Sequence, residues 1–233
     1  MLRVCNLTTH YGNSQALFGV DLNFEIGQVA TLLGRNGMGK TTTINSIMGI
    51  VRASGGSIQF DGAELTGLPS FKIANLGIGL VPEGRQIFPN LSMRENLIAT
   101  ASNHLDRPDP WTVDRIYELF PELAARKSSM GNLLSGGEQQ MLAIGRALMT
   151  NPKLLILDEA TEGLAPLVRQ KIWTALNQIR GQNMSILVVD KNLRDLLKIA
   201  DVNFIIERGQ VVWSGDSDAL RKDRGALHRY LGV

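Results

Sequence analysis

Hydrophobic and polar residues alternate in short runs along the N-terminal quarter of the chain. These runs predict strands over LRVCNLTTHY, FGVDLNFEI, QVATLLG and SIQF. The Asp61-Gly62 pair that follows the last run is typical of a two-residue hairpin turn. In contrast, KTTTINSIMGI has helical spacing and begins directly after a glycine-rich turn. We therefore expect an antiparallel β region at the N-terminus, followed by a helix that starts near Lys40.

The pattern changes to helical spacing at about Phe88 and keeps it to about Leu133. MRENLIATA and WTVDRIYELF carry this spacing, and prolines separate them. We interpret this segment as an inserted helical lobe. Beyond it, strand-like and helix-like runs alternate in the order KLLILD, PLVRQKIWTALNQIRG, SILVVD, LRDLLKIA, NFIIE and QVVWSG. The alternation predicts right-handed crossovers and a parallel sheet, so the expected fold class is α/β.

The composition is that of an ordinary globular protein, with 44% hydrophobic and 20% charged residues in a chain of 233. The net charge of +2 gives no reason to expect a nucleic-acid partner. The single cysteine, Cys5, lies in an apolar run, which favours a core position in a reducing compartment. The N-terminus has no signal-peptide pattern, and no run reaches the ~18 apolar residues that span a bilayer. We expect a cytoplasmic protein that reaches a membrane only through a partner.

The segment GRNGMGKTT, residues 34–42, follows the apolar run VATLL and opens a helix. It matches the G-x-x-x-x-G-K-[ST] phosphate loop in the strand–loop–helix context that this motif requires. Backbone N–H groups of such a loop surround phosphates, while the lysine reaches the terminal phosphates and the hydroxyl suits Mg²⁺. The alternative is a glycine turn that only caps the helix. The expected nucleotide-binding residues are Gly34, Arg35, Asn36, Gly37, Met38, Gly39, Lys40, Thr41 and Thr42.

The segment LLILDEA, residues 154–160, is an apolar strand that ends in two carboxylates. A buried strand that delivers acids to its C-terminal end suits a metal ligand followed by a base. Asp158 would hold Mg²⁺, directly or through water, and Glu159 would polarise the water that attacks the terminal phosphate. The alternative is a solvated strand end with incidental acids.

The segment LLSGGEQQ predicts a well-capped helix whose first turn contains two glycines. Ser135 and Glu138 form an S-x-x-E capping box, with Gly136 and Gly137 between them. Glycine costs a helix interior roughly 0.8–1 kcal/mol relative to alanine, so the pair needs a reason. Bare N–H groups at a helix tip let a phosphate approach the backbone, with the Ser135 hydroxyl as a further donor. The alternative, an ordinary capped helix, does not explain the two glycines.

Together, the phosphate loop, LSGGEQQ and LLILDE resemble the nucleotide-binding subunits of ATP-binding-cassette (ABC) transporters, from Leu2 to about Gly215. GRNGMGKTT, VPEGRQIFPNLSMRENL and EGLAPLV look like the branched-chain amino acid importer ATPases. The resemblance implies one P-loop NTPase domain of the ABC ATPase fold. In it, a mixed-sheet core with an N-terminal antiparallel β subdomain spans 1–87 and 134–233, and a helical subdomain spans about 88–133. It also implies ATP and Mg²⁺ as ligands, and ATP hydrolysis coupled to transport.

The resemblance implies partners as well. Two such subunits stack head to tail, so that residues 135–138 of one face the ATP on the phosphate loop of the other. The second ABC ATPase subunit is either another copy or a different chain. Membrane permease subunits would hold the pair at the cytoplasmic face of the inner membrane, and a periplasmic solute-binding protein would deliver the solute. Selectivity for the solute would lie in those other proteins.

Further site residues follow from the resemblance alone. Tyr11 falls at the aromatic position that stacks on adenine, the alternative being an ordinary aromatic residue at a strand end. Glu83 replaces a glutamine that senses metal and water, and a carboxylate can bind Mg²⁺ through water. Ala165 replaces an aspartate that contacts the facing subunit.

Lys191 stands where most cassettes have histidine, and a protonated lysine has no acceptor lone pair. Glu159 therefore remains the preferred base, and Lys191 is either a phosphate ligand or a solvated lysine.

The start of the expected lobe contains four apolar residues, Phe88, Pro89, Leu91 and Met93. They form either part of a groove for a cytoplasmic helix of the permease or the lobe's own core. Two other functions also stay open at this point. One is a soluble cassette ATPase in an assembly process such as iron–sulfur cluster loading. The other is a non-hydrolysing, ATP-gated clamp, which the substitutions at Ala165 and Lys191 make conceivable.

Overall fold

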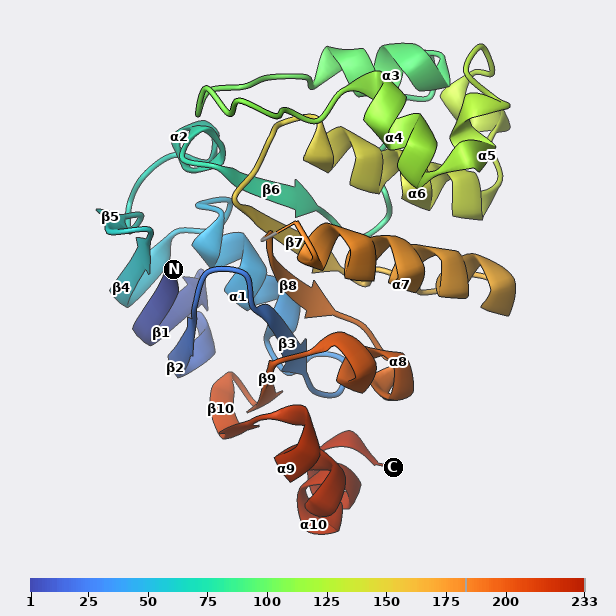
Figure 1. Ribbon diagram of the computed structural model, residues 1–233. Coiled ribbons are helices and arrows are strands. Elements are labelled where there is room, and N and C mark those ends of the chain that lie inside the picture. The colour runs from blue at the N-terminus through green and yellow to red at the C-terminus, as the bar shows by residue number, and fades with distance from the viewer. Residues whose placement is uncertain (183, 233) are drawn as a thin grey trace.

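The computed structural model describes residues 1–182 and 184–232, and two β-sheets form its centre (Figure 1). The N-terminal sheet is antiparallel and has the strand order β2-β1-β4-β5. Its strands are β1 (Leu2–Tyr11), β2 (Ser14–Phe24), β4 (Ala53–Phe60) and β5 (Ala63–Glu64). Asp61 and Gly62 have φ values of 50° and 85° and form the hairpin turn between β4 and β5. The predicted antiparallel β region is confirmed.

The core sheet has six strands in the order β10-β9-β3-β8-β7-β6. Its strands are β3 (Val29–Leu33), β6 (Ile78–Val81), β7 (Leu154–Asp158), β8 (Ser185–Val189), β9 (Val202–Glu207) and β10 (Gln210–Gly215). All neighbours are parallel except β10, which pairs antiparallel with β9. The reversal occurs at Arg208 and Gly209, which have φ values of 48° and 74°. The sheet is therefore mixed, as the family resemblance implied.

Helices cover the core sheet and also form a group of their own. The first set consists of α1 (Lys40–Ile47), α2 (Ser70–Asn75), α6 (Gly136–Leu148), α7 (Pro166–Arg180), α8 (Leu193–Ile199), α9 (Ser217–Lys222) and α10 (Arg224–Ala226). The second set lies at the top of Figure 1 with α6 and consists of α3 (Met93–Ala99), α4 (Val113–Leu119), α5 (Pro121–Ala124) and a 3₁₀ turn (Gly131–Leu133). A π-helical turn, Leu227–Leu231, follows α10.

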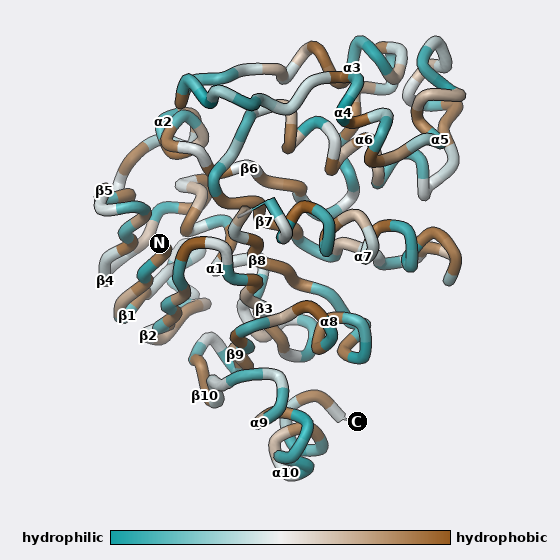
Figure 2. The backbone as a smooth tube through the Cα atoms, viewed as in Figure 1, coloured by the Kyte–Doolittle hydropathy of each residue, from teal (hydrophilic) through white to brown (hydrophobic). Residues whose placement is uncertain are grey.

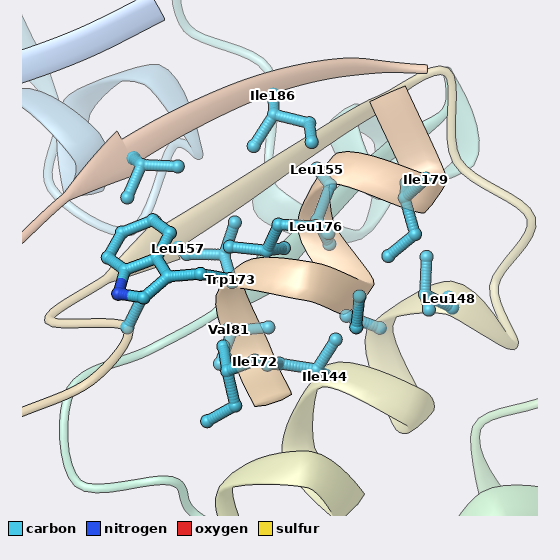
Figure 3. Packing of buried hydrophobic residues seen from close by; sticks show 14 of the residues in the cluster. Val81, Ile144, Leu148, Leu155, Leu157, Ile172, Trp173, Leu176, Ile179 and Ile186 are labelled. Carbon is cyan, nitrogen blue, oxygen red and sulfur yellow. The ribbon is translucent and has the colours of Figure 1, made fainter. Parts of the chain in front are cut away.

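Apolar side chains fill both faces of the core sheet. Alternate residues of β7 enter two separate clusters, Leu155 and Leu157 on one face and Leu154 and Ile156 on the other. Figure 3 shows the first cluster, in which α7 and α6 pack against β7 and β8. Along α7, hydrophobic and hydrophilic residues alternate at helical spacing, so that one side of the helix faces this core (Figure 2). Strands buried on both faces explain why these segments read as continuous apolar runs.

Two details differ from the expectations. Cys5 is exposed, so the prediction of a core position was wrong. Leu2 and Val4 face inward, so regular alternation turns Cys5 outward. A bulge follows at Asn6, which has a φ of 48°, and the pairing with β2 shifts between Val4 and Leu7, so that Leu7 faces inward again. The bulge interrupts the alternation of inward and outward side chains. The short helix α2, which follows Pro69, was not predicted, because its six residues are too few for a periodic pattern.

Within residues 1–182 and 184–232, none of the helices combines the length and the hydrophobicity that crossing a bilayer requires.

Candidate active site

The loop between β3 and α1 depends on glycine for its shape. Gly34, Gly37 and Gly39 have φ values of 147°, 77° and 108°. A Cβ at position 34 would lie 2.4 Å from the carbonyl oxygen of Ile206, so only glycine fits there. Gly39 is the N-cap of α1, and no side chain caps this helix end. The first N–H groups of α1 are therefore left for a ligand, which is the arrangement that binds phosphate.

The Lys40 side chain lies across the mouth of this loop. Its ammonium donates hydrogen bonds to the carbonyl oxygens of Gly34 and Arg35, both at 2.9 Å. The pKa of Lys40 is lowered, mainly because the ammonium is partly buried, while the nearby Asp158 carboxylate acts in the opposite direction. A cation that only carbonyl oxygens hold is well placed to bind phosphate oxygens, which would be stronger partners.

Asp158, at the end of β7, carries a buried oxygen without a partner. The residue is 3% exposed, and its Oδ1 atom makes no hydrogen bond to any described residue. Burial raises the pKa of Asp158, a hydrogen bond from Thr41 lowers it, and the charge of Glu83 raises it. Thr41, Glu83 and Asp158 line one cavity of about 300 Å³. The sequence predicted these three residues as a metal site, and the structure places them together.

This set of oxygen atoms fits Mg²⁺. Mg²⁺ binds through one or two carboxylates and completes its shell with water and substrate phosphates. No group of three or more His, Cys, Asp or Glu residues is arranged to hold a metal within the described part of the chain. A metal at this position would therefore rely on two carboxylates and the Thr41 hydroxyl, which is the smaller protein contribution that Mg²⁺ uses.

The phosphate loop forms one wall of an open cleft of about 430 Å³. Glu83 and Glu159 also line it, and β2 and the β9–β10 turn supply the other wall. Those opposite residues are Gln15, Ala16, Phe18, Arg208 and Gly209. The turn is tied to the loop, since the Gly209 N–H donates to the Met38 carbonyl oxygen at 2.9 Å.

The wall opposite the phosphate loop was missed in the sequence. Phe18 is 45% exposed beside the cleft. Alternation along the strand would place it on the same face as the buried Val20, and the register shift at Gly19, which has a φ of 93°, turns it outward, so no local signal identified it. Tyr11, the residue expected to stack on adenine, is 50% exposed and does not line the cleft itself. Its hydroxyl lies 3.5 Å from the Thr42 hydroxyl, so Tyr11 stands at the edge of the cleft, next to α1.

Glu159 and Lys191 follow the ends of the adjacent strands β7 and β8. Glu159 lines the cleft and has a φ of 56°, a conformation that residues with a side chain rarely adopt. Such strained positions concentrate at functional sites. The Lys191 ammonium forms an ion pair with the Glu162 carboxylate, and its charge lowers the pKa of Lys40. Both residues are thus near the phosphate loop, although Lys191 does not line the cleft.

The capping box at the start of α6 is present. The Ser135 N–H donates to Glu138 Oε2 at 2.7 Å, and the Glu138 N–H donates to Ser135 Oγ at 3.3 Å. Gly136 is half-buried, and a Cβ there would meet the end of the flexible Arg85 side chain at 3.0 Å. Among the described residues, none of positions 135–138 lines the cleft.

Gly137 has a second reason to be glycine. The sequence interpretation gave both glycines the role of baring the helix tip. Gly137 is also buried against α7, where a Cβ would lie 2.6 Å from the Val168 side chain. Its missing side chain is therefore explained by packing within the chain, although its backbone N–H still belongs to the first turn of α6.

A second groove, of about 300 Å³, lies between α2, β6 and α6. The Arg146 guanidinium lies on one side of it, donates to the Gln86 carbonyl oxygen at 2.7 Å and stacks over the Phe88 ring at 4.0 Å. Phe88 and Pro89 are exposed and Leu91 is half-buried, but Met93 is fully buried. Of the two roles considered for Met93, the structure therefore supports the lobe's own core.

Comparison with known proteins identifies relatives of the chain. A model of the ABC transporter family matches residues 17–162. The chain is 41% identical to the high-affinity branched-chain amino acid transport ATP-binding protein BraG of Pseudomonas aeruginosa, over 100% of both chains. It is 33% identical to the lipopolysaccharide export system ATP-binding protein LptB of Escherichia coli, over 97% of this chain and 95% of LptB.

The fold also has solved counterparts. A crystal structure of a nucleotide-free ATP-binding cassette from an ABC transporter superimposes with a TM-score of 0.85 at 25% identity. The superposition covers 100% of this chain and 98% of the other. The mixed core sheet, the antiparallel N-terminal sheet and the helices above them are therefore an arrangement already seen by experiment.

Proposed function

The chain belongs to the ABC transporter family and is an ATPase of that family, and from this premise we propose that it powers the import of branched-chain amino acids through a membrane permease. One observation carries the choice of solute: the 41% identity with BraG extends over the whole of both chains. Export of lipopolysaccharide is the second candidate, supported by the 33% identity with LptB. The identity with BraG is higher, and the importer-like VPEGRQIF segment agrees with it.

ATP would lie in the cleft with its phosphates on the loop 34–42. The free N–H groups at the start of α1 would donate to phosphate oxygens, and Lys40 would exchange its two carbonyl partners for the terminal phosphates. The adenine ring would stack near the edge of the cleft, where Tyr11 and the newly identified Phe18 are both exposed. These assignments rest on the positions of the side chains around the cleft.

Thr41, Asp158 and Glu83 would hold Mg²⁺ beside the terminal phosphates. When bound, Mg²⁺ would neutralise phosphate charge and orient the leaving group. The observation that supports this assignment is that Asp158 Oδ1 is buried and has no hydrogen-bond partner within residues 1–182 and 184–232. Because a metal would favour the ionised carboxylate, it would also offset the effect of burial, which raises the pKa of Asp158.

Glu159 would act as the general base. Its carboxylate would accept a proton from the water that attacks the terminal phosphorus, while ADP leaves on the opposite side. The strained backbone at Glu159 fixes the start of this side chain at the cleft wall. Most of the barrier would be lowered by positioning and charge neutralisation, since phosphoryl transfer leaves little covalent work for the protein.

A second cassette would complete the site. The α6 tip, with Ser135, Gly136 and the N–H groups that precede Glu138, would contact the terminal phosphate of ATP bound to the facing subunit. Loss of that phosphate would remove the link between the subunits and allow the pair to open. Closure and opening would move the helical segment 88–133 together with the permease helices. The extent of the shift is limited by the difference in ATP affinity between the two states.

The permease would also determine where the protein is found. We place the chain at the cytoplasmic face of the inner membrane, held there by permease subunits and supplied indirectly by a periplasmic solute-binding protein. The groove beside Arg146 is the surface that we assign to the permease, because Pro82, Arg85 and Gln86 in its lining connect Glu83, at the cleft, to the helical segment. Phe88 stacks on that arginine and would form its rim. No nucleic acid takes part.

Reconstitution tests the proposal. The membrane proteins that copurify with the chain are placed in proteoliposomes with it, and the periplasmic solute-binding protein is added on the opposite side of the membrane. Uptake of radiolabelled leucine, isoleucine and valine is then measured with ATP inside and outside. We expect uptake that depends on ATP on the side of this chain and that disappears with Lys40→Ala. A complex that hydrolyses ATP but extracts lipopolysaccharide would support the second candidate instead. A chain that copurifies with no membrane protein would favour a soluble assembly role.

A further inference from the structure

The loops that follow β7 and β8 are fastened together by one buried carboxylate. Asp190 is 9% exposed and accepts hydrogen bonds from the N–H and the hydroxyl of Thr161, both at 2.7 Å. It also accepts one from the Asn192 N–H at 2.7 Å. Thr161 follows Glu159 by two positions, and Asn192 follows Lys191 directly. The carboxylate therefore fixes the backbone around both residues as one unit.

An ion pair also connects these two loops. The Lys191 ammonium contacts the Glu162 carboxylate, and the two side chains are 52% and 42% exposed. Both charges act on the pKa of Lys40 in the phosphate loop, Lys191 lowering it and Glu162 raising it. The pair thus stands within electrostatic reach of the place where the phosphates of ATP would lie.

The chemistry of this pair suits an exchange of partners. Lysine carries one compact charge on a flexible stem, so it can turn from one anion to another without moving the backbone. A half-exposed ion pair is held only weakly. The terminal phosphate of ATP carries more negative charge than one carboxylate and offers three oxygen acceptors, whereas ADP does not place that group there.

We propose that Glu162 is a positioning residue that holds Lys191 beside the cleft and releases it to the terminal phosphate of ATP. Glu162 and Lys191 therefore report whether a third phosphate is present. Asp190 holds the backbones of the two loops in a fixed relative position, so that only the Lys191 side chain has to move. The inference rests on the proposed function, because it requires ATP to bind on the phosphate loop.

A double-mutant cycle tests the exchange. Affinities for ATP and ADP are measured in four full-length chains that all carry Glu159→Gln to suppress turnover. One chain carries no further change, and the other three add Glu162→Gln, Lys191→Met or both substitutions. We expect Glu162→Gln to raise the ratio of ATP affinity to ADP affinity by about three- to fivefold, since only ATP has to displace the carboxylate. In the Lys191→Met chain, the same substitution should leave the ratio unchanged.

A matched control removes another exposed ion pair. Glu122 pairs with Lys171 at partly exposed positions, and neither residue lines the cleft. Glu122→Gln should leave the ratio unchanged in every background. An unchanged ratio with Glu162→Gln, or an equal change with and without Lys191, overturns the inference while the proposed function stands. Absence of ATP binding in the parent chain overturns the proposed function and this inference with it.

Discussion

Two helices of this chain have glycine at their N-terminal ends, yet the two ends are built differently. At α1, Gly39 is the N-cap with a φ of 108°, and no side chain caps the helix. At α6, Ser135 is the N-cap, and Glu138 completes a reciprocal capping box. The end of α1 opens into a cleft of about 430 Å³ that the chain itself lines. The end of α6 contributes no described residue to that cleft.

In the proposed function, the α1 end belongs to a site that one chain supplies, and the α6 end to a site that needs a second chain. Around α1, the chain supplies a lysine, a hydroxyl and two nearby carboxylates. At α6, the capping box already satisfies two of the backbone donors that a helix end leaves free. Fewer groups therefore remain at α6 for a ligand. We expect substitutions at the α1 cleft to have larger effects than substitutions at the α6 tip.

Glu159→Gln should give the largest effect, because it removes the proposed base and keeps the shape of the side chain. We expect kcat for ATP hydrolysis to fall about 10³-fold, with ATP affinity nearly unchanged. Steady-state phosphate release and equilibrium ATP binding measure the two quantities separately. Equal rates for the variant and the wild type would eliminate Glu159 as the base. A wild type without any hydrolysis, in the presence of its permease, would support the ATP-gated clamp.

Lys40→Ala should come next, through binding rather than chemistry. Loss of a charge-assisted contact to phosphate should weaken ATP binding by about 100-fold. The increase in melting temperature that ATP produces in the wild type should then disappear at moderate ATP concentrations. Lys72→Ala, at an exposed position of α2, is the control and should keep the full increase. A normal thermal shift in Lys40→Ala would contradict the phosphate-loop assignment.

Gly136→Asp should test the α6 tip with the fold intact. Its carboxylate would lie beside the Arg85 guanidinium and at a helix N-terminus, and both surroundings favour a negative charge. The same carboxylate would repel the phosphates of ATP on a facing subunit. We expect the ATPase rate to fall about 30-fold, because the added negative charge opposes the electrostatic stabilisation that this helix end would give the terminal phosphate. ATP binding to the isolated chain should stay unchanged, and a parallel loss of that binding would place the α6 tip in the chain's own site instead.

The sequence predicted the residues around the start of α1 far better than the surroundings of the two glycines at the start of α6. The phosphate loop and Asp158 are local motifs on predicted elements, and the structure brings them together at the carboxyl ends of parallel strands. Phe18 and Gly209 could not be identified in this way. They reach the cleft only because the β9–β10 turn contacts β2 and the phosphate loop, over distances in the sequence that no local pattern spans.

The α6 end also shows how one sequence signal can have two causes. Two adjacent glycines suggested one role, but their neighbours differ: Gly136 meets a flexible arginine, and Gly137 meets the branched side chain of Val168. Val168 lies on another helix, so the reason for Gly137 depends on tertiary packing that the motif itself does not contain. Cys5 gives a related lesson in β1, where it follows the inward-facing Val4 and therefore faces outward, although the run around it is apolar.

Gly137→Ala should give the smallest effect, and it should act on stability rather than on ATP. A Cβ at this position would lie 2.6 Å from Val168 Cγ1, closer than packed atoms tolerate. Overpacking of this kind should lower the free energy of unfolding by about 1–2 kcal/mol, in spite of the better helix propensity of alanine. Urea denaturation of the full chain measures the change. In a chain that already carries Val168→Ala, adding Gly137→Ala should lower the free energy of unfolding by much less than it does in the wild type, because the clashing methyl group is gone.

Gly136→Ala, at the neighbouring position, should leave the free energy of unfolding nearly unchanged, since the Arg85 side chain can move aside. Equal destabilisation by both alanine substitutions would mean that propensity in the first turn, and not the contact with Val168, explains why position 137 is glycine.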